Sequence, residues 1–116
     1  VAEILERCGE RLAVLSGDDA LSLPMYSLGA KGVISVASNV VPEQMSSLYR
    51  LFKEGKVGEA ACLQAGLNRL FVTLFIEPNP QPAKAALALM GEMEDVLSWR
   101  CRGAQVGFIT SLVTGP

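Results

Sequence analysis

Two short apolar runs near the amino end constrain the fold of this chain more than any other feature. Residues 12–15 read Leu-Ala-Val-Leu, and residues 32–36 read Gly-Val-Ile-Ser-Val. Runs of this length without polar alternation are typical of strands buried on both faces, as in a parallel sheet. About 15 residues separate them, which is enough for a crossover helix. The pattern therefore predicts a strand–helix–strand unit and an α/β fold.

The segment between the two runs is predicted to be an acidic turn followed by a short helix. Asp18 and Asp19 follow the first run and are good N-cap residues. Pro24 has to lie within the first turn of the helix, because a proline further inside would break its hydrogen-bond ladder. We therefore expect the helix to start near Ser22 and to end at Gly29. The positions expected to face the sheet are Leu21, Met25 and Leu28.

Further helices are predicted from apolar spacing and from the positions of glycine and proline. Residues 1–8 form an amphipathic helix before the first run, and residues 57–75 form a longer one. A helix from Pro42 to Gly55 carries an apolar stripe of Met45, Leu48, Tyr49 and Phe52. Proline occupies every second position in residues 77–82 and also restricts the residue before it, so this segment cannot be helical. It is predicted to connect to a last helix over residues 83–90.

Composition limits the classes of function. Charged residues make up 19% of the 116 positions, below the ~25% of typical soluble domains, which suggests that other protein covers part of the surface. The net charge of −2 and the lack of a basic cluster argue against nucleic-acid binding. There is no histidine, so Cys8, Cys62 and Cys101 predict buried thiols in a reducing compartment rather than a zinc site. No apolar run is long enough to span a membrane and no signal peptide opens the chain, so we expect a cytoplasmic protein.

Several motifs resemble the carboxyl-terminal part of the dihydrodipicolinate synthase family. They are Ser-Gly-Asp-Asp at 16–19, Gly-Ala-Lys-Gly-Val-Ile-Ser-Val at 29–36, Asn-Val-Val-Pro at 39–42, Glu-Pro-Asn-Pro at 77–80 and Lys-Ala-Ala-Leu at 84–87. The resemblance implies a partial (β/α)₈ TIM barrel, with its last two strands followed by carboxyl-terminal helices. Residues 1–55 would then be the last two βα units, residues 56–97 the helical extension, and residues 98–116 a tail that departs from the family pattern.

The resemblance also implies a lyase of lysine biosynthesis that condenses pyruvate with aspartate semialdehyde, needs no further cofactor and assembles as a homo-oligomer. Family members form a Schiff base between pyruvate and a barrel lysine, and a tyrosine flanked by threonines relays protons. Neither has a counterpart among these residues, so no catalytic residue is predicted. None of the four lysines matches the Schiff-base position: Lys31, Lys53, Lys56 and Lys84.

What carries over from the family is a set of substrate-binding residues. Gly17 matches a glycine that lets the backbone approach the substrate, and Ile34 matches a residue whose backbone carbonyl faces pyruvate. Asp18 and Asn79 match residues near the second substrate. Each also has a plainer explanation, because Gly17 suits a tight turn, Asp18 a helix cap and Asn79 a support for the prolines.

Two other interpretations stay open. The chain could be a catalytically inert barrel piece that self-associates or docks on another subunit, because an incomplete barrel exposes sheet edges. It could also belong to a related pyruvate aldolase, although the Glu-Pro-Asn-Pro motif at 77–80 argues against this.

Overall fold

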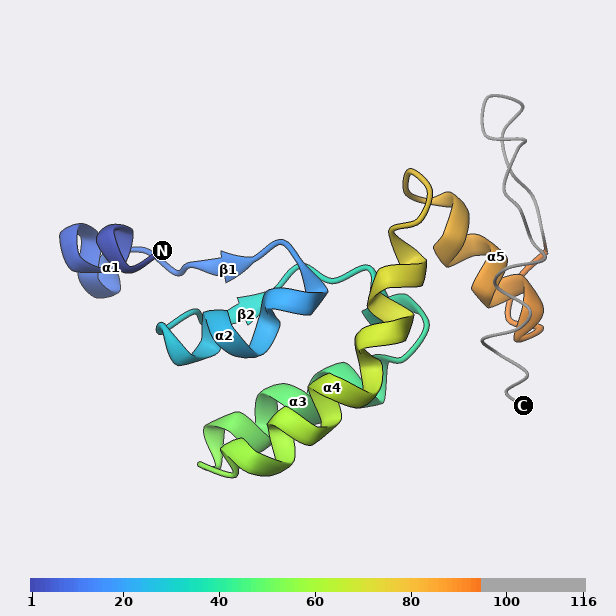
Figure 1. Cartoon of the computed structure of the whole chain (residues 1–116). Coiled ribbons are helices and arrows are strands. Elements are labelled where there is room, and N and C mark those ends of the chain that lie inside the picture. Colours follow the sequence, from blue (N-terminus) through green and yellow to red (C-terminus); the bar gives the residue numbers. More distant parts are fainter. Residues whose placement is uncertain (95–116) are drawn as a thin grey trace. The chain divides into compact units, whose positions relative to one another are not determined.

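The computed structural model describes residues 1–94, and Figure 1 labels the main elements along the chain. The helices are α1 (Ala2–Cys8), α2 (Ser22–Ser27), α3 (Pro42–Lys53), α4 (Val57–Leu74) and α5 (Gln81–Leu89). The strands are β1 (Leu15–Ser16) and β2 (Gly32–Val33), and 3₁₀ turns lie at η1 (Gly9–Arg11), η2 (Asp19–Leu21) and η3 (Ala37–Asn39). The chain divides into a compact unit over Val1–Asn68 and a second one that begins at Arg69. The tail predicted over 98–116 lies outside the described residues.

The strands β1 and β2 pair in parallel, with Leu15 opposite Gly32 and Ser16 opposite Val33. This confirms the predicted strand–helix–strand unit, although both strands are shorter than the apolar runs. Burial on both faces is wrong for the first run, because Leu12 is 48% exposed and Leu15 is 45% exposed. Leu12 lies outside β1, and within residues 1–94 the sheet has only two strands of two residues each, which is too small to cover the side chains on both of its faces.

Helix α2 starts at Ser22 as predicted, but a different face of it is buried. Leu23 and Tyr26 are buried, whereas Leu21 and Leu28 are each 52% exposed, so the expectation that these two leucines face the sheet is wrong. Leu21 lies in η2 rather than in α2. A 3₁₀ turn has three residues per turn, so its apolar phase does not continue into the α-helix that follows.

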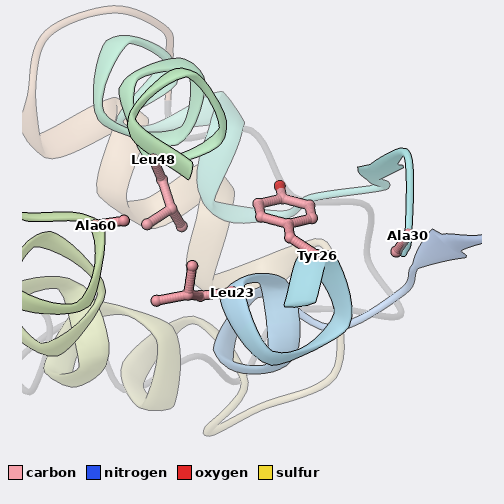
Figure 2. Close-up of a cluster of buried hydrophobic side chains, with 5 residues drawn as sticks. All are labelled: Leu23, Tyr26, Ala30, Leu48 and Ala60. Carbon is pink, nitrogen blue, oxygen red and sulfur yellow. The ribbon is translucent and has the colours of Figure 1, made fainter. Parts of the chain in front are cut away.

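The core of the first unit joins α2, α3 and α4 (Figure 2). Its buried members are Leu23, Tyr26, Ala30, Leu48 and Ala60. The Tyr26 ring packs edge-on against Tyr49, with centroids 5.1 Å apart, and lies 5.8 Å from Phe52. Helix α3 begins at Pro42, and its predicted stripe faces this core, with Met45 and Leu48 buried and Tyr49 and Phe52 packed at the edge. This confirms the assignment of α3.

The second unit contains the end of α4, the proline-rich loop and α5. Residues 77–80 are non-helical as predicted, but the prediction is wrong for Gln81 and Pro82, which are the first two residues of α5. A proline is tolerated in the first turn of a helix, where its missing N–H has no intrahelical partner. Apolar residues buried in this unit are Phe71, Leu74, Pro82, Ala83, Ala85 and Ala86. No helix within the described range is long and apolar enough to cross a membrane.

The cysteines are less buried than predicted. Cys62 is exposed on α4 and Cys8 is only partly buried, and both are free thiols. The expectation of a buried thiol is therefore wrong for Cys62. Cys101 lies outside the described residues.

Candidate functional site

The candidate site begins with the turn that follows β1. The hydroxyl of Ser16 donates to the Asp18 carbonyl at 2.8 Å and accepts from the Asp18 N–H at 3.2 Å, which closes the turn around Gly17. A Cβ at Gly17 would meet no atom within 4 Å, so within this chain the turn leaves open space at that position. This open space is what a close approach of substrate to the backbone requires.

Asp18 and Asp19 have different tasks although they are adjacent. Asp18 is the N-cap of η2, and its Oδ1 accepts from the Ala20 N–H at 2.8 Å. Asp19 is 1% exposed, and its Oδ2 accepts from the N–H groups of Val36 and Ala37 at 3.0 Å each. Asp18 is thus exposed and its carboxylate bonds only to a residue two positions along the chain. Asp19 is buried, and its carboxylate joins the turn after β1 to the segment after β2.

Ile34 directly follows β2 and lies beside the first turn. Its N–H donates to the Ser16 carbonyl at 2.8 Å, so Ile34 and Gly17 occupy the same edge, where both parallel strands end. The Ile34 side chain is 71% exposed. Downstream, the Ser35 hydroxyl accepts from the Ser38 N–H at 2.8 Å and fixes the loop into α3. Three of the four predicted site residues, Gly17, Asp18 and Ile34, are therefore gathered at one edge.

Asn79 belongs to the second unit. It is exposed in the proline-rich loop between α4 and α5, and Pro80 follows it as the residue before α5. Its predicted role near the second substrate remains a prediction.

An open pocket with a volume of about 370 Å³ is lined by residues of β2, α2 and α3 and of the loop between β2 and α3. Its lining combines two tyrosines with apolar groups and several serines: Tyr26, Gly32, Val33, Ser35, Ser38, Pro42, Met45, Ser46 and Tyr49. Burial raises the pKa of the Tyr26 phenol above its usual value, while the Ser22 hydrogen bond opposes that shift. Tyr26 therefore stays protonated near neutral pH and presents a neutral hydroxyl.

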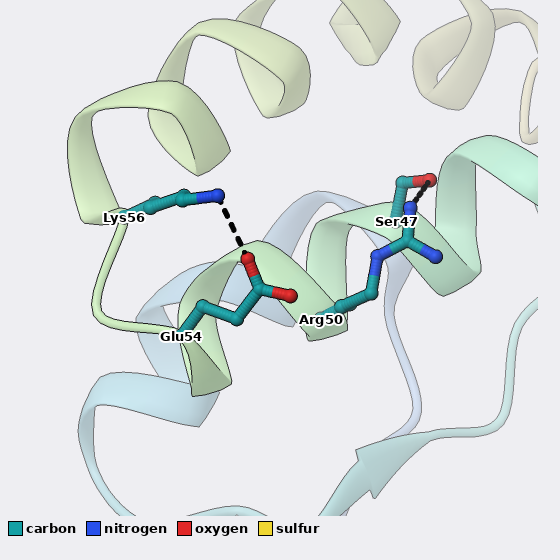
Figure 3. A network of polar contacts seen from close by, with 4 residues as sticks. All are labelled: Ser47, Arg50, Glu54 and Lys56. Atoms are coloured by element: carbon teal, nitrogen blue, oxygen red, sulfur yellow. Dashed lines mark hydrogen bonds and ion pairs between the residues drawn. The ribbon is translucent and has the colours of Figure 1, made fainter.

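The lysines of the first unit lie away from the candidate edge. Lys31 precedes β2, at the opposite end of the strand from Ile34, and Lys53 is the exposed last residue of α3. Lys56 forms an ion pair with Glu54 at 2.9 Å, next to the hydrogen bond from Arg50 to Ser47 (Figure 3). The hydrogen bond and charge of Glu54 raise the pKa of Lys56, and Lys56 in turn lowers the pKa of Glu54. A Schiff-base lysine needs a lowered pKa, so the shift at Lys56 has the wrong sign for that chemistry.

Sequence reasoning missed two residues that build this edge. Asp19 was expected to be a helix cap, and Gln64 of α4 was not singled out. The Gln64 Nε2 donates to the Ala20 carbonyl at 2.8 Å and to the Asp19 carbonyl at 3.3 Å. The sequence does show two aspartates after a strand, which draws attention to Asp19. Its hydrogen bonds join residues 17 to 45 positions apart, and no local sequence pattern predicts contacts of that kind.

Curated proteins that are similar to this chain in sequence carry the same enzyme name. A 4-hydroxy-tetrahydrodipicolinate synthase of Sorangium cellulosum is 53% identical over 91 residues, which are 78% of this chain and 30% of that protein. The enzyme of the same name from Persephonella marina is 49% identical over 96 residues, which are 83% of this chain and 33% of that protein. The chain thus spans about a third of the length of these curated relatives.

Solved structures agree. The dihydrodipicolinate synthase of Aquifex aeolicus superposes with a TM-score of 0.92 at 40% identity, over 97% of this chain and 40% of that one. The Acinetobacter baumannii enzyme, whose structure is a complex with pyruvate, gives 0.89 at 28% identity, over 97% of this chain and 40% of that one. These neighbours are TIM-barrel proteins, and the two parallel strands and helices seen here are consistent with part of such a barrel. The model of the dihydrodipicolinate synthetase family matches residues 1–100, and the chain belongs to this family.

Proposed function

We propose that this chain forms one wall of the substrate pocket in a lyase that condenses pyruvate with aspartate semialdehyde. Residues 1–55 are the last two βα units of the barrel, with β1 as the seventh strand and β2 as the eighth, and residues 56–97 are the helical extension. The observation that carries the proposal is the parallel pair β1–β2, whose carboxyl ends bring Gly17 and Ile34 to one edge. In barrel enzymes the active site lies at this edge.

Each predicted site residue has a role in this proposal. Gly17 leaves room for the backbone to approach pyruvate, and the backbone carbonyl of Ile34 faces it. Asp18 lies near the second substrate, as the family resemblance implies. Its carboxylate is exposed and accepts one short hydrogen bond from a backbone N–H, so it remains accessible to a ligand. Asn79, in the loop before α5, has the role near the second substrate that the family resemblance implies.

The amine that forms the Schiff base is supplied by residues other than these 116. Schiff-base formation needs an amine with a lowered pKa beside the bound carbonyl compound. Lys31 lies at the wrong end of β2, and the pKa of Lys56 is raised. Lys53 is the last residue of α3 rather than a residue at a strand end, and Lys84, on α5, does not match the Schiff-base position of the family. The chain alone is therefore inactive and works with the part of a barrel that carries the amine and the proton relay.

Borohydride trapping tests this proposal. The chain is incubated with pyruvate and borohydride and its mass is measured, alone and after mixing with the part of the Aquifex aeolicus synthase that precedes the matched region. We expect no adduct on this chain in either sample, an adduct on the added polypeptide, and condensing activity only in the mixture. A stable adduct on this chain, or no activity in the mixture, would overturn the proposal.

A second candidate is an inert piece that associates with itself. The observation in its favour is the exposure of apolar residues around the strands, namely Leu12, Leu15 and Ile34. Size-exclusion chromatography with light scattering separates the two candidates. Self-association that persists in the presence of the added barrel polypeptide favours the inert piece, whereas its replacement by a one-to-one complex favours the pocket wall.

A further inference from the structure

We propose that Asp19 is a positioning residue, whose carboxylate sets where the Ile34 carbonyl lies relative to Gly17. The inference rests on the proposed function, because it concerns the two residues placed against pyruvate there. It assigns to Asp19 a task that differs from that of its neighbour Asp18.

The carboxylate of Asp19 makes the contacts that carry this inference. Its Oδ2 accepts from the Val36 and Ala37 N–H groups at 3.0 Å each, and the whole residue is 1% exposed. Hydrogen bonds to an ionised acceptor are about twice as strong as neutral ones, and here water does not compete for them. Two consecutive N–H groups are thus held by one oxygen from a segment 17 and 18 residues earlier in the chain.

The backbone of Asp19 is itself fixed from the other side. Gln64 of α4 donates through Nε2 to the carbonyls of Asp19 and Ala20, at 3.3 and 2.8 Å. Ala20 also donates its N–H to the Asp18 carboxylate at 2.8 Å. The carboxylate of Asp19 therefore acts from a backbone that α4 and the η2 cap hold in place.

Ile34 lies between two anchors as a result. Its N–H is bound to the Ser16 carbonyl at 2.8 Å, next to Gly17. Two and three residues later, Val36 and Ala37 are bound to Asp19, two residues after Gly17. The backbone is consequently held on both sides of the Ile34 carbonyl. A displacement of about 1 Å at a substrate contact can cost about a hundredfold in rate, so this double fixing bears on catalysis.

The test uses Asp19→Asn, with Glu59→Gln as the matched control. Asparagine is isosteric, and the Asp19 Oδ1 that an amide nitrogen would replace is buried without a partner among the described residues, so the change removes charge without changing volume. Glu59 is an exposed carboxylate in the first turn of α4. In the 116-residue chain we expect amide hydrogen exchange at Val36 and Ala37 to become about tenfold faster in Asp19→Asn, with an upfield shift of both amide protons in NMR spectra, and no change in Glu59→Gln.

The second readout is steady-state kinetics of the mixture with the Aquifex aeolicus barrel polypeptide. We expect Asp19→Asn to lower kcat/KM for pyruvate about tenfold, mainly through KM, and Glu59→Gln to leave both parameters unchanged. Unchanged exchange at Val36 and Ala37 in Asp19→Asn overturns the inference whether or not the mixture is active. Faster exchange with unchanged kinetics also overturns it, because Asp19 would then be structural only. An inactive wild-type mixture overturns the proposed function, and the positioning role with it, while the exchange data still report the Asp19 contacts.

Discussion

Replacing Leu48 by alanine should be the most damaging single truncation in the first unit. Leu48 is 0% exposed and lies among Leu23, Tyr26, Ala30 and Ala60 (Figure 2). Removing its buried carbons loses their transfer free energy and leaves a cavity, because α2, α3 and α4 close only partly around the gap. From the usual range for buried leucines we expect the free energy of unfolding to fall by about 3 kcal/mol.

Leu21→Ala is the matched control for this truncation. Leu21 is 52% exposed, so about half of its apolar surface is already in water and the same substitution should cost only about 1 kcal/mol. Urea unfolding of both variants and of the parent chain, followed by far-ultraviolet circular dichroism, measures the difference. If the two variants lose the same free energy to within about 0.5 kcal/mol, the core described around Leu48 is wrong.

Two further predictions concern polar groups. Gln64→Ala removes the donor to the Asp19 and Ala20 carbonyls, but it also removes the buried Gln64 Oε1, which has no partner among the described residues. We therefore expect a net loss of only about 1 kcal/mol in the same urea assay, and a loss above about 3 kcal/mol would contradict this balance. Burial raises the pKa of Tyr26, so the folded state holds the phenolic proton more tightly than the unfolded state. The resulting stability is complete below about pH 10 and is lost as pH rises through the folded pKa, and Tyr26→Phe should flatten this alkaline loss in unfolding measured from about pH 9 to 11. Equal slopes for the two chains would refute the assignment.

Local signals predicted the helix boundaries well, and long-range contacts escaped prediction. Pro42 fixed the start of α3 and Pro24 limited the start of α2, because a proline restricts the backbone wherever it occurs. The buried face of α2 was missed, because η2 shifts the phase between Leu21 and Leu23 and apolar spacing alone does not reveal a 3₁₀ turn.

In the candidate site, too, some residues were predicted from the sequence and a long-range contact was missed. Gly17, Asp18 and Ile34 were predicted from the resemblance to the family, and the pairing of β1 with β2 brings them to one edge. Asp19 looked like a second cap, because an aspartate after a strand has the same local pattern whether it binds the next turn or a segment 17 residues away. The geometry of the edge depends on that distant contact.

The distribution of exposed apolar residues favours a chain that is covered by other protein. Helix α3 has the usual distribution for a helix packed on a core, because Met45 and Leu48 are buried and its polar positions face water. Around the strands, in contrast, apolar side chains face water: Leu12, Leu15 and Ile34 expose about half or more of their surface. The charged fraction of 19%, below the ~25% of typical soluble domains, agrees with such cover. An inert monomer would leave these side chains in water, whereas both a completed barrel and a self-associated piece would bury them.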